Sequence, residues 1–117
     1  MTNEIKVIIL EAEKDEAIIV EKWEHSLDNL QKFVGGYIEA VRVTDSITLW
    51  INEEGKLEGL EPNFHLCRMN GMPYDLVVGD VLIAGTDEEG NTVSLTDDEI
   101  KEVQERFLSR RHFNMMF

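Results

Sequence analysis

The glycine pair Gly35-Gly36 constrains the fold of this chain more than any other feature. The segment before it carries apolar side chains at the spacing of a helix, namely Leu27, Leu30, Phe33 and Val34. The segment after it, 37–43, alternates in the manner of a strand. Glycine tolerates the left-handed backbone conformation that ends a helix. The block therefore predicts a helix at about 26–35, with Ser26 as its N-cap, that turns directly into a strand.

Runs of β-branched and aliphatic residues predict further strands on both sides of this block. Ile5 to Ala12 and Ala17 to Trp23 indicate an opening hairpin, because a short polar segment separates them. Ile47 to Ile51 indicates a later strand. The loop Asn52 to Gly55 then has glycine where a hairpin turn needs it, so we expect the chain to return as a strand at Lys56-Leu57.

The segment Glu61 to Tyr74 is the least regular part of the sequence, since two prolines and a glycine interrupt it. Val77 to Ala84 regains strand character, with Gly79-Asp80 in its interior as a predicted bulge or bend. The loop 87–91 then predicts a second hairpin turn that leads into Thr92 to Ser94.

Thr96 and Glu99 have the spacing of a capping box, so they predict the start of a final helix at about 97–111. Together the segments predict a single α+β domain spanning residues 1–117. We expect a mainly antiparallel sheet of about five to seven strands with two helices, at about 26–35 and about 97–111.

The chain of 117 residues has a net charge of −13, which disfavours direct binding of nucleic acid. The charge is explained either by solubility or by an acidic face that imitates a phosphate backbone. Cys67 is the single cysteine, so no internal disulfide can form. The longest apolar run near the N-terminus, Val7 to Leu10, is too short to span a membrane. We expect a cytoplasmic protein that does not bind a membrane.

Three arginines near the end of the predicted final helix, Arg106, Arg110 and Arg111, form the most suggestive functional cluster. Guanidinium groups match phosphate oxygens bidentately, so the cluster predicts a docking point for a phosphorylated small molecule or nucleotide. The structural alternative is that Glu102 pairs with Arg106 while the other two stabilise the C-terminal end of the helix.

The irregular segment 61–74 is the second candidate region, because long connections often carry function. From it we take Asn63 and His65 as ligand-binding candidates beside the arginines. His65 and Cys67, with Asp75 or Asp80 downstream, are the best set for a metal site, and His65, Cys67 and Asp75 are the best set for catalysis. Their spacing fits no metal or nucleophile motif. The plainer interpretation is a buried cysteine and a surface histidine. We predict no catalytic residue, no metal and no cofactor.

Several segments, in their order along the chain, resemble an uncharacterised domain family of bacteriophages and mobile elements, the domain of unknown function numbered 3846. The matching parts are the opening hairpin, Leu30 to Ala40 with its core Val34 to Glu39, Asn52 to Leu57, Pro62-Asn63, Val77 to Gly85 and Ser94 to Ile100. The resemblance implies a phage-type origin and a small α+β fold, and it brings no established active site.

These observations favour a small phage-type intracellular accessory protein that acts by binding and not by catalysis, in the host cytoplasm. Host-defence evasion by sequestering a phosphorylated nucleotide signal is the leading hypothesis. One alternative is an acidic, nucleic-acid-mimicking inhibitor of a host DNA-handling protein, and another is an enzyme that uses the segment 61–74. The apolar end of the chain, Phe113 to Phe117, further suggests a homo-oligomer.

Overall fold

The computed structural model describes residues 3–14, 16–68, 72–105 and 114–116. Its main sheet has six antiparallel strands, and with the two helices it confirms the predicted α+β class. In spatial order the strands are β2 (Ile18–Glu24), β1 (Glu4–Leu10), β7 (Val81–Thr86), β4 (Ile47–Asn52) and β3 (Ile38–Arg42), and the short β8 (Thr92–Val93) pairs with β7. The opening hairpin is confirmed as the pair of β1 and β2.

Helix α1 (Leu27–Val34) begins after the predicted N-cap Ser26 and ends at the predicted glycine pair. The Asn29 backbone N–H donates to Ser26 Oγ at 3.0 Å, which satisfies one free donor of the first turn. At the other end Gly35 takes the left-handed conformation, with φ of 82°, and its N–H donates to the Gln31 carbonyl at 2.8 Å. Leu30 and Val34 are the buried residues of this helix.

Helix α2 (Asp97–Glu105) starts with the predicted capping box. The Glu99 N–H donates to Thr96 Oγ1 at 3.1 Å, and the Thr96 N–H donates to Glu99 Oε1 at 2.9 Å. Residues 106–111 of the expected helix lie outside the described residues. Neither described helix has the length and apolarity needed to cross a membrane.

The segment expected to be irregular is instead part of a second sheet, so that expectation was wrong. β5 (Pro62–Cys67) pairs with β6 (Pro73–Val78) antiparallel and with β9 (Asn114–Met116) parallel. The two prolines that suggested a loop stand at the first positions of their strands, where a missing N–H is tolerated.

Two further strand predictions need correction. The run 77–84 is not one strand, because it is divided between β6 and β7, which belong to different sheets. The chain changes sheet at Gly79, whose φ is +77°. Lys56-Leu57 is not a strand either: the segment 53–59 is a series of turns in which the Glu58 N–H donates to the Glu54 carbonyl and the Leu60 N–H to the Gly55 carbonyl.

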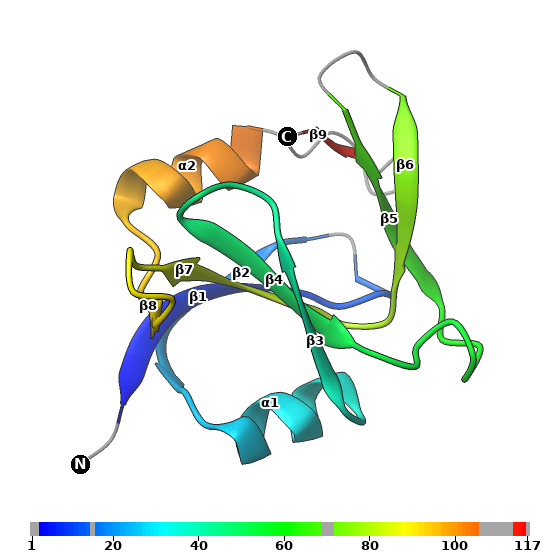
Figure 1. Cartoon of the computed structure of the whole chain (residues 1–117), viewed down its shortest axis with the longest axis horizontal. Coiled ribbons are helices and arrows are strands. Elements are labelled where there is room, and N and C mark those ends of the chain that lie inside the picture. Colours follow the sequence, from blue (N-terminus) through cyan, green and yellow to red (C-terminus); the bar gives the residue numbers. More distant parts are fainter. Residues whose placement is uncertain (1–2, 15, 69–71, 106–113, 117) are drawn as a thin grey trace.

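The two helices cover opposite faces of the main sheet, as Figure 1 shows. On one face, residues of the sheet pack with α2 and with the second sheet, the largest buried side chain being Phe64. On the other face, a smaller core packs around Leu30 of α1 and includes Val7 and Leu82. We refer to these two sides as the α2 face and the α1 face.

Candidate functional site

The hairpin of β3 and β4 presents different chemistry on its two faces. Glu39 lies opposite Ile51, whereas Ala40 lies opposite Trp50 and Arg42 opposite Thr48. Successive residues of a strand point to opposite faces, so the first pair belongs to the α2 face and the other two pairs belong to the α1 face. Each face of this hairpin contributes to a separate hollow.

The hollow on the α2 face, the acidic notch, lies between β4, β6 and the loop 53–61, and its volume is about 260 Å³. Its apolar lining comes from Ile51, Leu57, Leu76 and Val78, and its charged lining comes from Glu39, Glu53, Lys56 and Asp75. Lys56 Nζ lies 2.7 Å from Asp75 Oδ1. Within the described part of the chain, the carboxylates of Glu39 and Glu53 have no such cationic partner.

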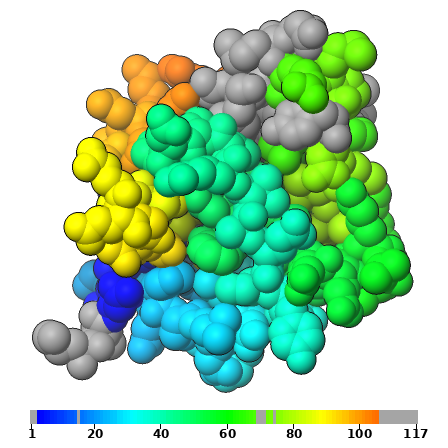
Figure 2. Space-filling view, viewed as in Figure 1, coloured from blue at the N-terminus to red at the C-terminus, as the bar shows by residue number. Residues whose placement is uncertain are grey.

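The hollow on the α1 face, the threonine pocket, has a volume of about 230 Å³. It is lined by Ala40, Arg42, Thr48, Trp50, Thr86, Gly90 and Thr92. Figure 2 shows that the yellow segment linking β7 to β8 borders the green β3–β4 hairpin on the viewed side of the molecule. None of the lining residues is acidic, in contrast to the acidic notch.

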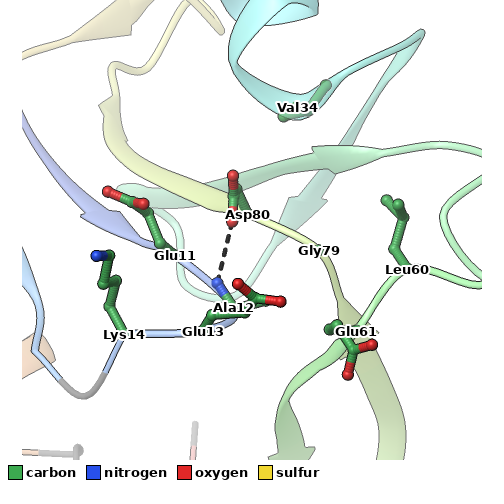
Figure 3. A pocket seen from close by; sticks show the side chains of 9 residues that line it. All are labelled: Glu11, Ala12, Glu13, Lys14, Val34, Leu60, Glu61, Gly79 and Asp80. Carbon is green, nitrogen blue, oxygen red and sulfur yellow. Dashed lines mark hydrogen bonds between the residues drawn. The ribbon is translucent and has the colours of Figure 1, made fainter.

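A third hollow, of about 280 Å³, lies where β1 ends and the chain passes from β6 to β7 (Figure 3). Four carboxylates line it, from Glu11, Glu13, Glu61 and Asp80. Asp80 Oδ1 accepts a hydrogen bond from the Ala12 N–H at 3.0 Å, drawn as the dashed line in Figure 3. Across the described residues, no three His, Cys, Asp or Glu side chains are arranged to hold a metal ion.

Asn63, a predicted ligand-binding residue, has a structural role close to this third hollow. The residue is 6% exposed, and Nδ2 donates to the Leu10 carbonyl at 2.9 Å and to the Gly79 carbonyl at 2.8 Å. The amide therefore joins the end of β1 to the turn between β6 and β7, and its donors are already used.

The other candidates of segment 61–74 do not converge. His65 is exposed on β5, whereas Cys67 is 2% exposed and its sulfur lies 4.0 Å from the His65 carbonyl oxygen. The Asp75 carboxylate pairs with Lys56 in the acidic notch. A histidine base, a thiol and a carboxylate thus face three different surroundings. Arg106, Arg110 and Arg111 lie outside the described residues, so the phosphate-docking hypothesis for them stays a prediction.

Among the described residues, three titratable groups outside the hollows have shifted pKa values. The hydrogen bond from the Asn91 N–H lowers the pKa of Asp87, and side-chain hydrogen bonds with Asp97 and Glu21 raise the pKa of Lys6. Burial lowers the pKa of His25. Asp87 has a local structural consequence, because its Oδ1 also accepts from the Glu89 N–H at 2.9 Å and so fixes the loop beside the threonine pocket.

A comparison with protein-family models found one that matches residues 5–108 and is described as Domain of unknown function (DUF3846). The chain belongs to the DUF3846 family. No curated protein and no solved structure gave a significant match. The part of this DUF3846 domain that matches the family contains all three hollows, whereas Arg110 and Arg111 lie beyond it.

Sequence reasoning missed both hollows of the β3–β4 hairpin in this DUF3846 domain. A signal was present, since the alternation in Tyr37 to Val43 already separates Glu39 from Ala40 and Arg42. The residues that complete each hollow from other strands could not be found from this alternation. The acidic notch is completed by Leu76 of β6 and the threonine pocket by Thr86 of β7, and both strands are distant in the sequence.

Proposed function

We propose that this DUF3846 domain is a small accessory protein of phage type that acts by binding a basic surface of a partner protein. The partner inserts an arginine or lysine side chain into the acidic notch. This proposal develops the acidic-inhibitor hypothesis, in which the partner is a host protein that handles DNA. The single observation that carries it is a notch with aliphatic walls and two carboxylates that have no cationic partner in the described part of the chain.

The chemistry of the acidic notch matches a long cationic side chain in two respects. Arginine and lysine bury an aliphatic stem while their charged head stays near polar groups. The stem would lie against Ile51 and Leu76, and the head would meet Glu39 and Glu53. Lys56 forms its ion pair with Asp75, so the carboxylates of Glu39 and Glu53 are left to accept hydrogen bonds from a second cation.

The loop 53–61 adds an apolar anchor beside the notch. Leu57 is 89% exposed and Tyr37, next to the loop, is 67% exposed, so both side chains present apolar surface that a partner can contact. The loop is held in shape by several bonds: the Glu53 N–H donates to the Tyr37 carbonyl at 2.9 Å, and the Glu54 N–H donates to Asn52 Oδ1 at 2.8 Å. A fixed loop with an exposed leucine loses little entropy on binding, which favours a protein partner.

The negative net charge favours a basic partner, but the distribution of the carboxylates does not favour imitation of a phosphate backbone. The net charge of −13 steers a basic surface toward the molecule at long range. Carboxylates occur on the strands, the helices and the loops of the described residues, and not along one stripe alone. Competition between this domain and DNA for the partner is therefore the measurement that tests a DNA-handling target.

Site-specific photo-crosslinking followed by titration tests the proposal. A photo-crosslinking residue placed at Leu57 should capture a host protein, whereas the same residue at Leu27, which is 59% exposed on α1, should not. The captured protein is then purified and titrated with the full chain by calorimetry, with and without DNA. Loss of binding when DNA is added identifies a DNA-handling surface as the target.

Variants of the notch decide whether the bound surface is the proposed one. The double variant Glu39→Gln/Glu53→Gln should weaken binding about tenfold, which corresponds to about 1.4 kcal/mol. The matched control Glu88→Gln/Glu89→Gln removes the same charge from the β7–β8 loop and should leave the affinity unchanged. Equal weakening by both double variants would mean that net charge alone drives association, and it would refute the notch.

A further inference from the structure

We infer that the threonine pocket binds a small ligand that carries an oxyanion on a flat ring, of the nucleoside monophosphate class. The inference is independent of the protein-binding proposal, because this pocket lies on the other face of the β3–β4 hairpin. It also differs from phosphate docking at the end of the final helix, since the cation here is Arg42.

The lining of the pocket contains one arginine and three threonines that can donate hydrogen bonds, and it contains no carboxylate. The Arg42 guanidinium donates from Nη2 to the Asp45 carbonyl at 3.2 Å, which leaves other N–H groups free to bind an oxyanion. The hydroxyls of Thr48 and Thr86 lie 2.6 Å apart, so one of them donates to the other and the second proton is free for a ligand. Trp50 also lines the pocket, but its Nε1 is itself buried, without an acceptor among the described residues, and is not counted among these donors.

The lining of this pocket differs in charge from the other hollows, although the loop at its edge carries Asp87, Glu88 and Glu89. Carboxylates line the third hollow, the acidic notch and the hollow beside Tyr37, where Glu54 and Glu58 contribute. They are absent from the lining of the threonine pocket, and Arg42 has no carboxylate partner in the described part of the chain. Arginine with hydroxyl donors is a combination that recognises phosphate oxygens.

The shape of the pocket selects a flat and small ligand. Ala40 stands directly opposite Trp50 in the hairpin, so a methyl group leaves room beside the indole, and aromatic rings stack on nucleobases. The volume of about 230 Å³ is below the usual range for ligand pockets, which is about 300–1,000 Å³. A mononucleotide fits this size if its sugar stays in solvent. The Asp87 turn, with the Asn91 N–H on Asp87 Oδ1 at 2.8 Å, fixes the outer wall before the ligand arrives.

Calorimetry on the full chain, with adenosine monophosphate, adenosine and inorganic phosphate as separate probes, tests the inference. Adenosine monophosphate should bind most tightly, because it alone offers both the oxyanion and the ring. Arg42→Gln should weaken its binding about 10- to 100-fold, as expected for loss of a charge-assisted hydrogen bond. The control Lys22→Gln removes one positive charge from exposed β2 and should keep the affinity.

A spectroscopic readout places the ligand independently of affinity. The indole N–H resonance of Trp50, assigned with a Trp23→Phe variant, should shift on adding adenosine monophosphate. Circular dichroism checks that Arg42→Gln is folded. The inference is overturned if adenosine monophosphate gives neither heat nor an indole shift at millimolar concentration. It is also overturned if Arg110→Glu abolishes binding while Arg42→Gln does not, since the ligand would then belong to the arginines of the final helix.

Discussion

Replacing Asn63 should uncouple the two sheets of the fold, and the structure gives the magnitude. The side-chain amide donates two hydrogen bonds of 2.9 and 2.8 Å, to the carbonyls of Leu10 and Gly79. In Asn63→Asp the side chain keeps its size, but an ionised carboxylate offers only acceptors and would face two carbonyl oxygens. The perturbation therefore changes hydrogen bonding and charge while it leaves the packing volume almost unchanged.

The expected loss of stability is large for a single isosteric change. Each of the two carbonyls left without its donor costs about 1–3 kcal/mol if it stays buried, so Asn63→Asp should destabilise the fold by about 2–6 kcal/mol at pH 7. Lowering the pH to about 4 should recover part of this loss, because a protonated carboxyl can donate one hydrogen bond.

Urea unfolding at both pH values, followed by tryptophan fluorescence, measures this effect. Asn29→Asp is the matched control: the Asn29 amide also donates to a backbone carbonyl, that of Glu24, at 2.9 Å, but in an exposed position near the start of α1. Water can replace that donor, so the control should cost less than about 1 kcal/mol. If Asn63→Asp is no more destabilising than Asn29→Asp, the amide does not hold the sheets together and the reasoning is refuted.

Two further predictions concern titration and backbone geometry. Burial lowers the pKa of His25, so the neutral ring stabilises the fold above the usual histidine pKa of about 6.5, and this contribution is lost as the pH falls below it. In thermal unfolding, His25→Gln should therefore lose less stability than the wild type between pH 7.5 and 5. Parallel curves of stability against pH for the two proteins would contradict this. Gly85→Ala would place a Cβ 2.7 Å from the Ser94 backbone oxygen and should lower the free energy of unfolding by about 3 kcal/mol. Gly90→Ala, at a φ of +86° with open space around it, should lower it by about 1 kcal/mol. Equal urea midpoints for the two variants would show that the structure relieves the Gly85 contact.

The features of the fold that the sequence predicts are those decided within a few residues. Ser26 caps α1 through the N–H three positions later, and Thr96 and Glu99 cap α2 through reciprocal bonds. Gly35 ends α1 because the left-handed conformation is available to it without a steric cost. Each of these signals needs no knowledge of the rest of the chain, and the structure confirms each of them.

The second sheet could not be predicted because its local signals conflict. Phe64 and Leu66 are buried on β5 while His65 between them is exposed, which is a strand alternation that the sequence does contain. Pro62 and Pro73 nevertheless argue for a loop, and only the pairing of β5 with β6 shows that both prolines start strands. Whether residues 77–84 form one strand or two is likewise decided by which sheet each half joins, and that choice is made by long-range packing.

The candidate sites depend on the same combination of local and distant information. Strand alternation assigns Glu39 to the face with aliphatic neighbours and Arg42 to the face with threonine and tryptophan neighbours. A single hairpin can therefore offer acceptors to a basic protein on one side and donors to an anionic ligand on the other. A one-residue change in the pairing of β3 with β4 would move each charge to the opposite face, so both proposed sites require the observed register. That register is held from outside the hairpin, because β4 pairs with β7 and the Asn52 amide donates to the Val34 carbonyl at the end of α1.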